Sequence, residues 1–360
     1  MIQERLKALR AEMEKRGITV YVVPTADFHE SEYVGDHFKA RKFITGFTGS
    51  AGTAVITLDE AGLWTDGRYF VQAENQLKDS TVTLYRMGEE GVPTVDEFVK
   101  DRLKEGGCLG FDGRVVNGTW GGRLEKIAAE KNVSMHVTED LIDLIWEDRP
   151  ALSKQPLFIL EEKYSGKSTA DKIADLRKAM KENGADVHIL TSLYDIAWLL
   201  NIRGNDIDYV PVVLSYLVLN ETECIWFLQE EVVDDKIRAY LEENHITTKP
   251  YDAIYDYVPE IPADAVVLMN RGTVNYRIVN SLDKAIKVVD KPNPTELMKA
   301  VKNKTEVDNT RAAHVKDGVA FTKFMYWLKT NIGKIPMTEI SASDYLEARR
   351  REQDNFIELS

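Results

Sequence analysis

The segment that decides the fold reads RLKALRAEMEKRGITVYVVPT at residues 5–25, and a related segment, KIADLRKAMKENGADVHILTS, follows 167 positions later at residues 172–192. The two copies share leucine, arginine, methionine and glycine at equal spacing: Leu9, Arg10, Met13 and Gly17, then Leu176, Arg177, Met180 and Gly184. In each copy, apolar residues at helical spacing end in a glycine, which is typical of a helix C-terminus, and alternating apolar residues of a strand follow. The repeat therefore predicts a helix-to-strand unit that is used twice.

Each copy continues into two apolar segments that a polar turn separates. In the first copy these segments cover residues 53–58 and 63–65, and in the second copy they cover residues 216–219 and 224–228. The turns are expected at Asp59-Glu60 and Asn220-Glu221. Duplication of a whole α/β module accounts for this agreement better than chance does.

Proline-rich interruptions divide the chain. Pro150 and Pro156 break the pattern before the second helix, and Pro292 and Pro294 mark a second linker. We therefore expect domains at 1–150 and 151–292, followed by a helical part at 293–360. In that last part the sequence predicts helices at 295–301, 305–330 and 341–353, with Asn303 and Glu306 spaced like a capping box, and the start of a strand at 356–360.

Composition excludes several classes of protein. With 44% hydrophobic and 29% charged residues, the chain has the balance of a globular protein that buries cores. A net charge of −13 argues against nucleic-acid binding, and no apolar run approaches the ~20 residues that span a bilayer. The N-terminus opens an amphipathic helix instead of a signal peptide, so a cytoplasmic protein is expected. Cys108 and Cys224 are expected to be buried thiols.

Four stretches, in this order, resemble the three-domain cytosolic type of Xaa-Pro aminopeptidase: TGFTGSAGT at 45–53, WTDGRYF at 64–70, DIAWLLNIRG at 195–204 and NPTEL at 293–297. The stretch AHVKDGVA at 313–320 is also similar to the opening helix of that family's catalytic domain. The resemblance implies an α/β fold in which two repeated creatinase N-terminal-like domains precede the first helices of an incomplete pita-bread metallopeptidase domain.

The same resemblance implies a function. Members of the family are hydrolases that release an N-terminal residue preceding proline, and they use two divalent metal ions, usually manganese. The family's ligands are two aspartates, one histidine and two glutamates, which lie beyond the segment represented here and have no counterparts in this chain. We therefore expect a chain that ends before its metal ligands, binds no metal and is inactive alone. In the whole protein the implied partners are proline-containing peptides and a second copy in a homodimer.

Trp64, Asp66, Arg68 and Tyr69 are the candidate site residues, because the corresponding place in the second repeat, residues 225–228, lacks an Asp-Gly-Arg sequence. One hypothesis is that Arg68 reaches the substrate groove or a partner subunit and binds a carboxylate there. The other is a turn at Asp66-Gly67 that begins a helix, with Arg68 in an ion pair and Trp64 and Tyr69 as packing residues.

Other motifs favour structural roles. Gly46, Gly49 and Gly52 precede a strand instead of a helix, so a tight turn is preferred to a phosphate loop. His29 begins a zinc-protease-like pattern, but Tyr33 replaces the second histidine, which excludes that metal site. His314 is expected to form a local pair with Asp317.

Two other classes of function remain open. A peptidase-like fold without metal ligands can act as a non-catalytic protein-binding module, and a related prolidase or creatinase is the third possibility. The apolar residues Phe321, Phe324, Met325 and Leu328 lie at helical spacing and are expected to be exposed if no sheet covers them.

Overall fold

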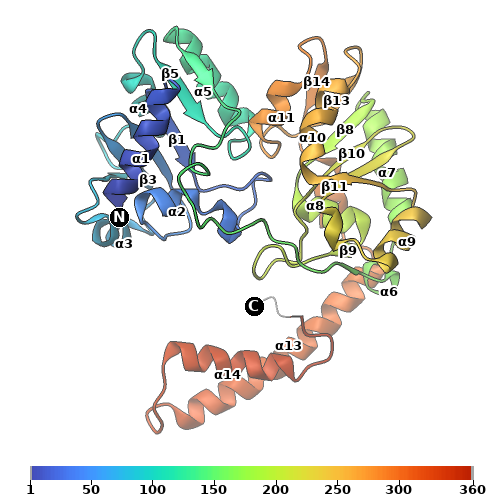
Figure 1. Cartoon of the computed structure of the whole chain (residues 1–360). Helices are drawn as coiled ribbons and strands as arrows, with labels where there is room; N and C mark the ends of the chain where they lie inside the picture. Colours follow the sequence, from blue (N-terminus) through green and yellow to red (C-terminus); the bar gives the residue numbers. More distant parts are fainter. Residues whose placement is uncertain (1, 358–360) are drawn as a thin grey trace.

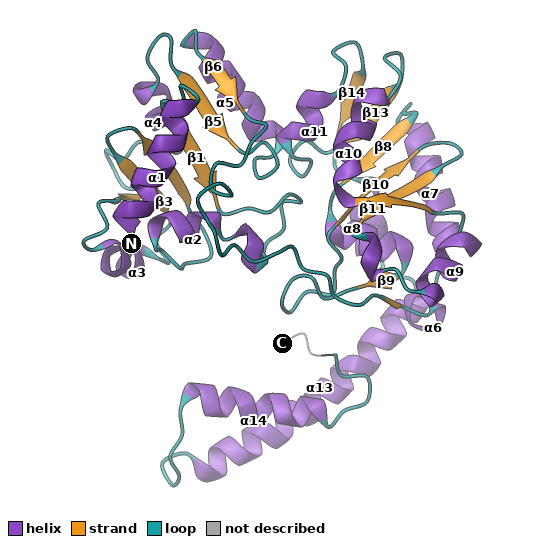
Figure 2. Ribbon diagram, viewed as in Figure 1, coloured by secondary structure: helices purple, strands orange, loops and turns teal. Residues whose placement is uncertain are grey.

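The computed structural model describes residues 2–357 and contains two six-stranded mixed sheets, each with helices on both faces (Figures 1 and 2). The first sheet has the strand order β4-β3-β2-β1-β5-β6. Its strands are β1 (Val20–Pro24), β2 (Thr53–Thr57), β3 (Ala61–Thr65), β4 (Thr83–Arg86), β5 (Cys108–Phe111) and β6 (Ser134–His136). We call these strands and their helices the first module.

The second sheet repeats this arrangement with the order β12-β11-β10-β8-β13-β14. Its strands are β8 (Val187–Leu190), β10 (Ser215–Leu219), β11 (Cys224–Leu228), β12 (Thr247–Pro250), β13 (Val266–Met269) and β14 (Lys287–Asp290). A separate two-stranded sheet pairs β7 (Phe158–Ile159) with β9 (Ile202–Arg203). Together with their helices, these strands form the second module.

The duplication predicted from the sequence is confirmed by strand pairing. β1 pairs antiparallel with β2 and parallel with β5, and β8 pairs antiparallel with β10 and parallel with β13. The expected turns also lie between the antiparallel strands β2 and β3 and between β10 and β11. Both predicted helix-ending glycines adopt the left-handed conformation, with φ 68° at Gly17 and 64° at Gly184. A side chain would be strained there, so the glycines stop both helices at equivalent places.

Helices cover both faces of the first sheet. The first face packs against α1 (Ile2–Lys15), α2 (Ala40–Thr45) and α3 (Phe70–Leu77). The opposite face packs against α4 (Val95–Arg102) and α5 (Gly118–Glu130). Apolar side chains alternate between these two cores along β1, where Tyr21 and Val23 enter one core and Val20 and Val22 the other.

The second module is covered in the same way. On one face lie α7 (Thr169–Glu182), α8 (Leu193–Leu200) and α9 (Asp235–Glu243), and on the other lie α10 (Ile254–Tyr257) and α11 (Tyr276–Ser281). The core beside α10 and α11 also contains Phe28 and Phe38, which belong to the first module. The two modules therefore share one hydrophobic core.

Equivalent helix N-termini join the modules. Asn117 caps α5 by accepting from Trp120 N, Asn275 caps α11 by accepting from Ile278 N, and the two asparagines form an antiparallel bridge. Main-chain hydrogen bonds cross the junction, including Gly118 N to Val274 O at 2.8 Å and Tyr276 N to Val116 O at 2.7 Å. Since these bonds link backbone to backbone, they fix the relative position of the two modules.

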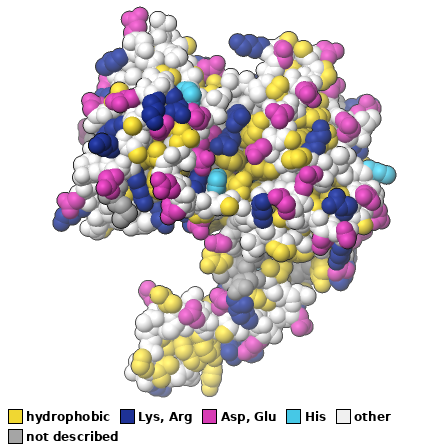
Figure 3. Space-filling view, viewed as in Figure 1, with side chains coloured by type: hydrophobic (Ala, Val, Ile, Leu, Met, Phe, Trp, Pro, Cys, Tyr) yellow, Lys and Arg dark blue, Asp and Glu magenta, His cyan; other side chains and the backbone are white. Residues whose placement is uncertain are grey.

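The last helices extend away from both modules as an arm (Figure 1). After α12 (Pro294–Ala300), the arm consists of α13 (Lys304–Asn331) and α14 (Glu339–Arg351), which pack through a Trp327–Tyr345 stack at 4.0 Å. The predicted capping box is present, with Asn303 Oδ1 accepting from Glu306 N and Glu306 Oε2 accepting from Asn303 N. Hydrophobic side chains gather on the arm's surface (Figure 3), where Phe321 is 48% exposed, while Phe324, Met325 and Leu328 are half-buried.

Some expectations differ in detail. The strand expected at 356–360 does not begin at Phe356 or Ile357, and residues 358–360 lie outside the described residues. Asp317 accepts a hydrogen bond from Arg350 Nε at 2.7 Å, so an interhelical contact replaces the expected local pair with His314. Both cysteines are buried and free, as predicted. Within residues 2–357, none of the helices combines the length and the apolar character that crossing a membrane requires.

Two neighbouring glycines of α5 provide a test of the junction. A Cβ atom at Gly121 would lie 2.1 Å from the Tyr276 ring, whereas one at Gly122 would meet nothing within 4 Å. Because alanine is the better helix former, Gly122→Ala should raise the free energy of unfolding by about 0.5–1 kcal/mol. Gly121→Ala should lower it by about 1–3 kcal/mol, because the methyl group overpacks the interface. Urea unfolding of both variants measures the difference, and equal effects would contradict this packing of α5 against Tyr276.

Candidate functional site

Asp66 and Arg68 form an exposed ion pair immediately after β3. Arg68 Nε and Nη2 donate to the two carboxylate oxygens of Asp66 at 2.8 and 2.9 Å, and Arg68 N also donates to Asp66 Oδ1. These hydrogen bonds lower the pKa of Asp66 to about 2. The Arg68 side chain is 69% exposed, so its guanidinium lies at the molecular surface. The contact closes the turn that precedes α3 and leaves the other side of the guanidinium in solvent.

Trp64 and Tyr69 lie on opposite sides of this turn. Trp64 is fully buried, stacks on Tyr85 with ring centroids 4.1 Å apart and donates from Nε1 to Pro93 O. The Tyr69 hydroxyl lies 2.6 Å from Ser50 Oγ, and the Tyr69 ring packs against Phe47. The structure thus brings Asp66, Arg68 and Tyr69 to one surface and places Trp64 in the core.

The glycine-rich segment packs beneath the same turn. A Cβ atom at Gly49 would lie 2.2 Å from the Phe47 ring and 2.8 Å from the Tyr69 ring, and one at Gly52 would lie 2.9 Å from Trp64 O. Close backbone approach therefore requires these glycines, as the tight-turn interpretation predicted.

Arg41 holds this glycine-rich segment from inside. Its guanidinium donates to Phe47 O, to Gly49 O and to Thr25 Oγ1, and it lies over the Phe47 ring. Burial lowers the pKa of Arg41 to about 10. Carbonyl dipoles and a ring face replace a carboxylate as the partners of this cation. No motif in the sequence singled out Arg41.

A second polar cluster joins the modules around His29. The imidazole is 2% exposed, and its Nδ1 lies 3.0 Å from Thr191 O while Nε2 lies 2.6 Å from Tyr251 Oη. Since a carbonyl accepts only, Nδ1 carries the proton and Nε2 accepts from the tyrosine. Burial lowers the pKa of His29 to about 4, so the ring is neutral at pH 7.

Tyrosines of the second module surround this histidine. Tyr216 packs 4.5 Å from the His29 ring, and its hydroxyl lies 2.9 Å from that of Tyr255. Asn275 donates to Phe28 O, next to His29 in the chain. Burial raises the pKa of Tyr255 to about 12, and it raises the pKa of Tyr216 and Tyr251 as well. All three hydroxyls are therefore neutral, and a buried carboxylate, that of Asp27, lies beside this cluster and accepts from His29 N at 2.9 Å.

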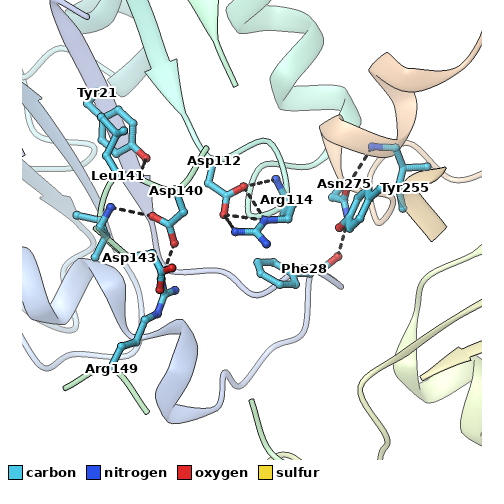
Figure 4. Close-up of polar contacts among 12 residues, drawn as sticks. Tyr21, Phe28, Asp112, Arg114, Asp140, Leu141, Asp143, Arg149, Tyr255 and Asn275 are labelled. Atoms are coloured by element: carbon cyan, nitrogen blue, oxygen red, sulfur yellow. Dashed lines mark hydrogen bonds and ion pairs between the residues drawn. The ribbon is translucent and has the colours of Figure 1, made fainter. Parts of the chain in front are cut away.

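A buried network of charges lies on the first module's side of the junction (Figure 4). Asp112, just after β5, accepts from Arg114, whose guanidinium lies 4.5 Å from the centre of the Phe28 ring. Asp140 accepts from Arg149 Nη1 at 2.6 Å, and burial together with Asp112 raises the pKa of Asp140. Each carboxylate has an arginine partner, which is the arrangement of structural ion pairs.

Metal-ligating residues do not converge in the part of the chain that the structure describes. Within residues 2–357, no group of three or more His, Cys, Asp or Glu side chains could hold a metal ion. Both ring nitrogens of His29, the histidine of the zinc-protease-like pattern, form hydrogen bonds, one with Thr191 O and one with the Tyr251 hydroxyl. These residues therefore do not fit a dinuclear metal centre.

Sequence reasoning missed the role of His29 and of Arg41 because their partners are distant in the chain. Position 29 lies outside the repeated segment at 5–25, so the repeat carries no signal for this histidine.

Comparison with known proteins agrees with this architecture. Sequence profiles described as Creatinase/Prolidase N-terminal domain match residues 5–145 and 148–306. A protein of Sordaria macrospora named Probable Xaa-Pro aminopeptidase P is 38% identical over 372 residues, and one of Laccaria bicolor with the same name is 39% identical over 377 residues. Each alignment covers 99% of this chain, which corresponds to 60% and 56% of those proteins. The chain thus spans somewhat more than half the length of these relatives.

A solved structure matches nearly the whole chain. The X-prolyl aminopeptidase from Caenorhabditis elegans, described as a cytosolic enzyme with a di-nuclear active site, is 31% identical with a TM-score of 0.92. The match covers 99% of this chain and 61% of that protein. Both modules and the arm therefore have counterparts in one known structure.

The neutral state of His29 predicts an acid-sensitive junction. A histidine whose pKa falls from 6.5 to about 4 on folding binds fewer protons in the folded state, so the free energy of unfolding decreases as pH falls through this window. The decrease attributable to His29 should be about 3 kcal/mol between pH 6.5 and 4. Urea unfolding across this range should show a shallower dependence for His29→Gln. The exposed His314→Gln variant serves as the control, and identical slopes for the wild type and His29→Gln would exclude the assigned role.

Proposed function

This chain belongs to the creatinase/prolidase family and is homologous along nearly its entire length to Xaa-Pro aminopeptidases, and we propose that it is the N-terminal part of an enzyme that releases an N-terminal residue preceding proline. The observation that carries the proposal is the match of 99% of the chain, including the arm, to the C. elegans enzyme at a TM-score of 0.92. A likeness of the two modules alone would indicate the family but not this member of it.

The proposed enzyme uses two divalent metal ions, with manganese as the proposed metal. When bound, such ions would lower the pKa of a water molecule and polarise the scissile carbonyl. The di-nuclear active site of the C. elegans enzyme supports two ions, and the relatives' greater length leaves room for the ligands outside these 360 residues. The described residues supply no such site, so their part is to position other groups and to shape access.

We divide the chain into domains at 1–150, 151–292 and 293–360. In this proposal the first domain shapes access to the active site and contributes to a homodimer, and the third domain begins the pita-bread catalytic fold. The exposed apolar side chains of α13 support that assignment, because they are the residues that a following sheet would cover. A cytoplasmic location is proposed from the description of the C. elegans enzyme as cytosolic.

The 360-residue chain alone should not hydrolyse a peptide with proline in second position, even with manganese added, because its described residues provide no ligand set. Release of the N-terminal amino acid measures this directly. Hydrolysis by the purified chain would contradict the proposal that the metal ligands lie outside these 360 residues.

The reading frame beyond Ser360 tests the function itself. We expect it to encode two aspartates, one histidine and two glutamates at convergent positions, and the longer protein should release the residue before proline. A frame that stops, or that continues without these residues, would instead favour a protein-binding module.

Arg68 is the side chain of the candidate set that we propose to contact substrate. Its guanidinium is exposed beside Asp66 and presents donors to solvent, so it can bind a peptide carboxylate or carbonyl. In the longer protein, Arg68→Met should lower kcat/KM for extended peptides by about tenfold, since a hydrogen bond to a charged group contributes about 1.5 kcal/mol. Dipeptides that are too short to reach Arg68 should be affected less.

Arg123→Met is the matched control for Arg68→Met, because Arg123 also forms an exposed ion pair, with Asp96, in the first module. If the two variants had equal kinetics, the role of Arg68 would be limited to closing the turn. Recovery of activity in Arg68→Lys would indicate that charge matters more than the two-pronged geometry.

A further inference from the structure

A cleft of about 340 Å³ lies where the second module meets α13. Its walls come from α6 (Glu162–Ser165), the ends of α8 and β9, and the first turns of α13. Gly166 locks this junction, because a Cβ atom there would lie 2.4 Å from Asn303 Oδ1 and 2.6 Å from Thr305 Cβ. The cleft is therefore part of a closely packed contact between two parts of the chain.

Cations dominate the lining of the cleft. Lys172, Arg203 and Lys302 contribute positive charge, and Glu306 is the one carboxylate among the described residues that line it. Glu306 also serves the capping box, since its Oε2 accepts from Asn303 N at 2.9 Å. The side chains of the cleft thus carry an excess of positive charge.

Lys172 is buried without a counter-ion. Its side chain reaches from α7, with the residue 1% exposed, and Nζ donates to Trp198 O at 2.8 Å and to Asn201 Oδ1 at 2.6 Å. Both acceptors are neutral, and burial together with the nearby Arg203 lowers the pKa of Lys172 to about 8. These bonds also satisfy the end of α8, so Lys172 has a structural role in addition to its charge.

Arg203 and Trp198 have donors to spare. Arg203 Nη1 donates to the carbonyl oxygens of Ala197 and Ile202, and burial lowers the pKa of this arginine. Within the described part of the chain, neither Arg203 nor Lys172 forms an ion pair with a carboxylate at 4.0 Å or less. Trp198 Nε1 is buried and has no hydrogen-bond partner among the described residues. This nitrogen has almost no accessible surface, so it does not contact a molecule in the open cleft.

We propose that this cleft binds a small oxyanion, a phosphate or a carboxylate group, held by Arg203 and Lys302. Planar guanidinium donors match both groups, and the positive lining attracts either one. The volume exceeds that of the anion alone, so the anion can belong to a larger molecule. This site lies on the second module, away from the Asp66–Arg68 turn of the first, and is independent of the proposed peptidase function.

Thermal unfolding of the 360-residue chain tests the proposal. Inorganic phosphate at about 10 mM should raise Tm by about 2 °C or more over sodium chloride at equal ionic strength, because a ligand that binds only the folded state stabilises it. Sodium acetate in a parallel series distinguishes a carboxylate site from a phosphate site, and a response to either anion supports the proposal. Equal Tm values in phosphate, acetate and chloride would overturn it.

Variants locate the effect. Arg203→Gln should weaken the anion response at least fivefold, and Lys302→Ala should weaken it to a smaller extent because this side chain lies at the exposed rim. Lys304→Ala is the matched control, since Lys304 stands two residues further along and is 89% exposed in a pair with Asp308. If Arg203→Gln does not fold, Lys302→Ala decides the outcome. An anion response that all of these variants retain would place the binding elsewhere and refute the assignment.

Discussion

The main-chain contact between the N-termini of α5 and α11 is the constraint on which the rest of the molecule depends. Asn117 and Asn275 each use the side-chain oxygen to cap their own helix, and the backbone around them forms bonds across the junction. These hydrogen bonds prevent the two modules from sliding past each other, because each N–H must stay within hydrogen-bond distance of its acceptor. Phe28 and Arg114 lie at this junction (Figure 4), and His29 contacts Thr191 across it.

Most buried groups at this junction are neutral or paired, and the exception is Asp27, which among the described residues accepts only from His29 N and Ser31 N. His29 and its tyrosine neighbours are uncharged at neutral pH, and Asp112 and Asp140 each face an arginine. The cleft beside α13 differs, since its three cations outnumber its one described carboxylate, Glu306.

Local sequence signals predicted the fold well because they depend on neighbours along the chain. The glycines at 17 and 184 and the Asn303–Glu306 box determine where helices end or begin through contacts within four residues. The repeat then predicted that an α/β module occurs twice, but it did not predict the order of the six strands in each sheet. The short helix α2 was not predicted, because its six residues are stabilised by burial of Phe43 and Ile44 against α1 and the sheet.

The candidate site was less predictable for the same physical reason. The stretch from Trp64 to Tyr69 stood out in the sequence, but its residues differ in role. Trp64 stacks on Tyr85, 21 positions away, and only the folded chain shows that Arg68 lies in solvent. Arg41 and His29 find their partners through tertiary contacts, so no spacing rule could have assigned them.

The way in which α13 begins has a mechanical consequence. Its first turn is clamped to the second module by Asn303, which donates to Ser165 O, and by the close contact with Gly166, while its far end projects beyond both modules. At 1.5 Å per residue, a helix of this length is a rigid lever of roughly 42 Å, so a tilt of about 5° at the base moves the tip by roughly 4 Å. The contacts around Gly166 thus determine the direction of α13 and the position of its far end.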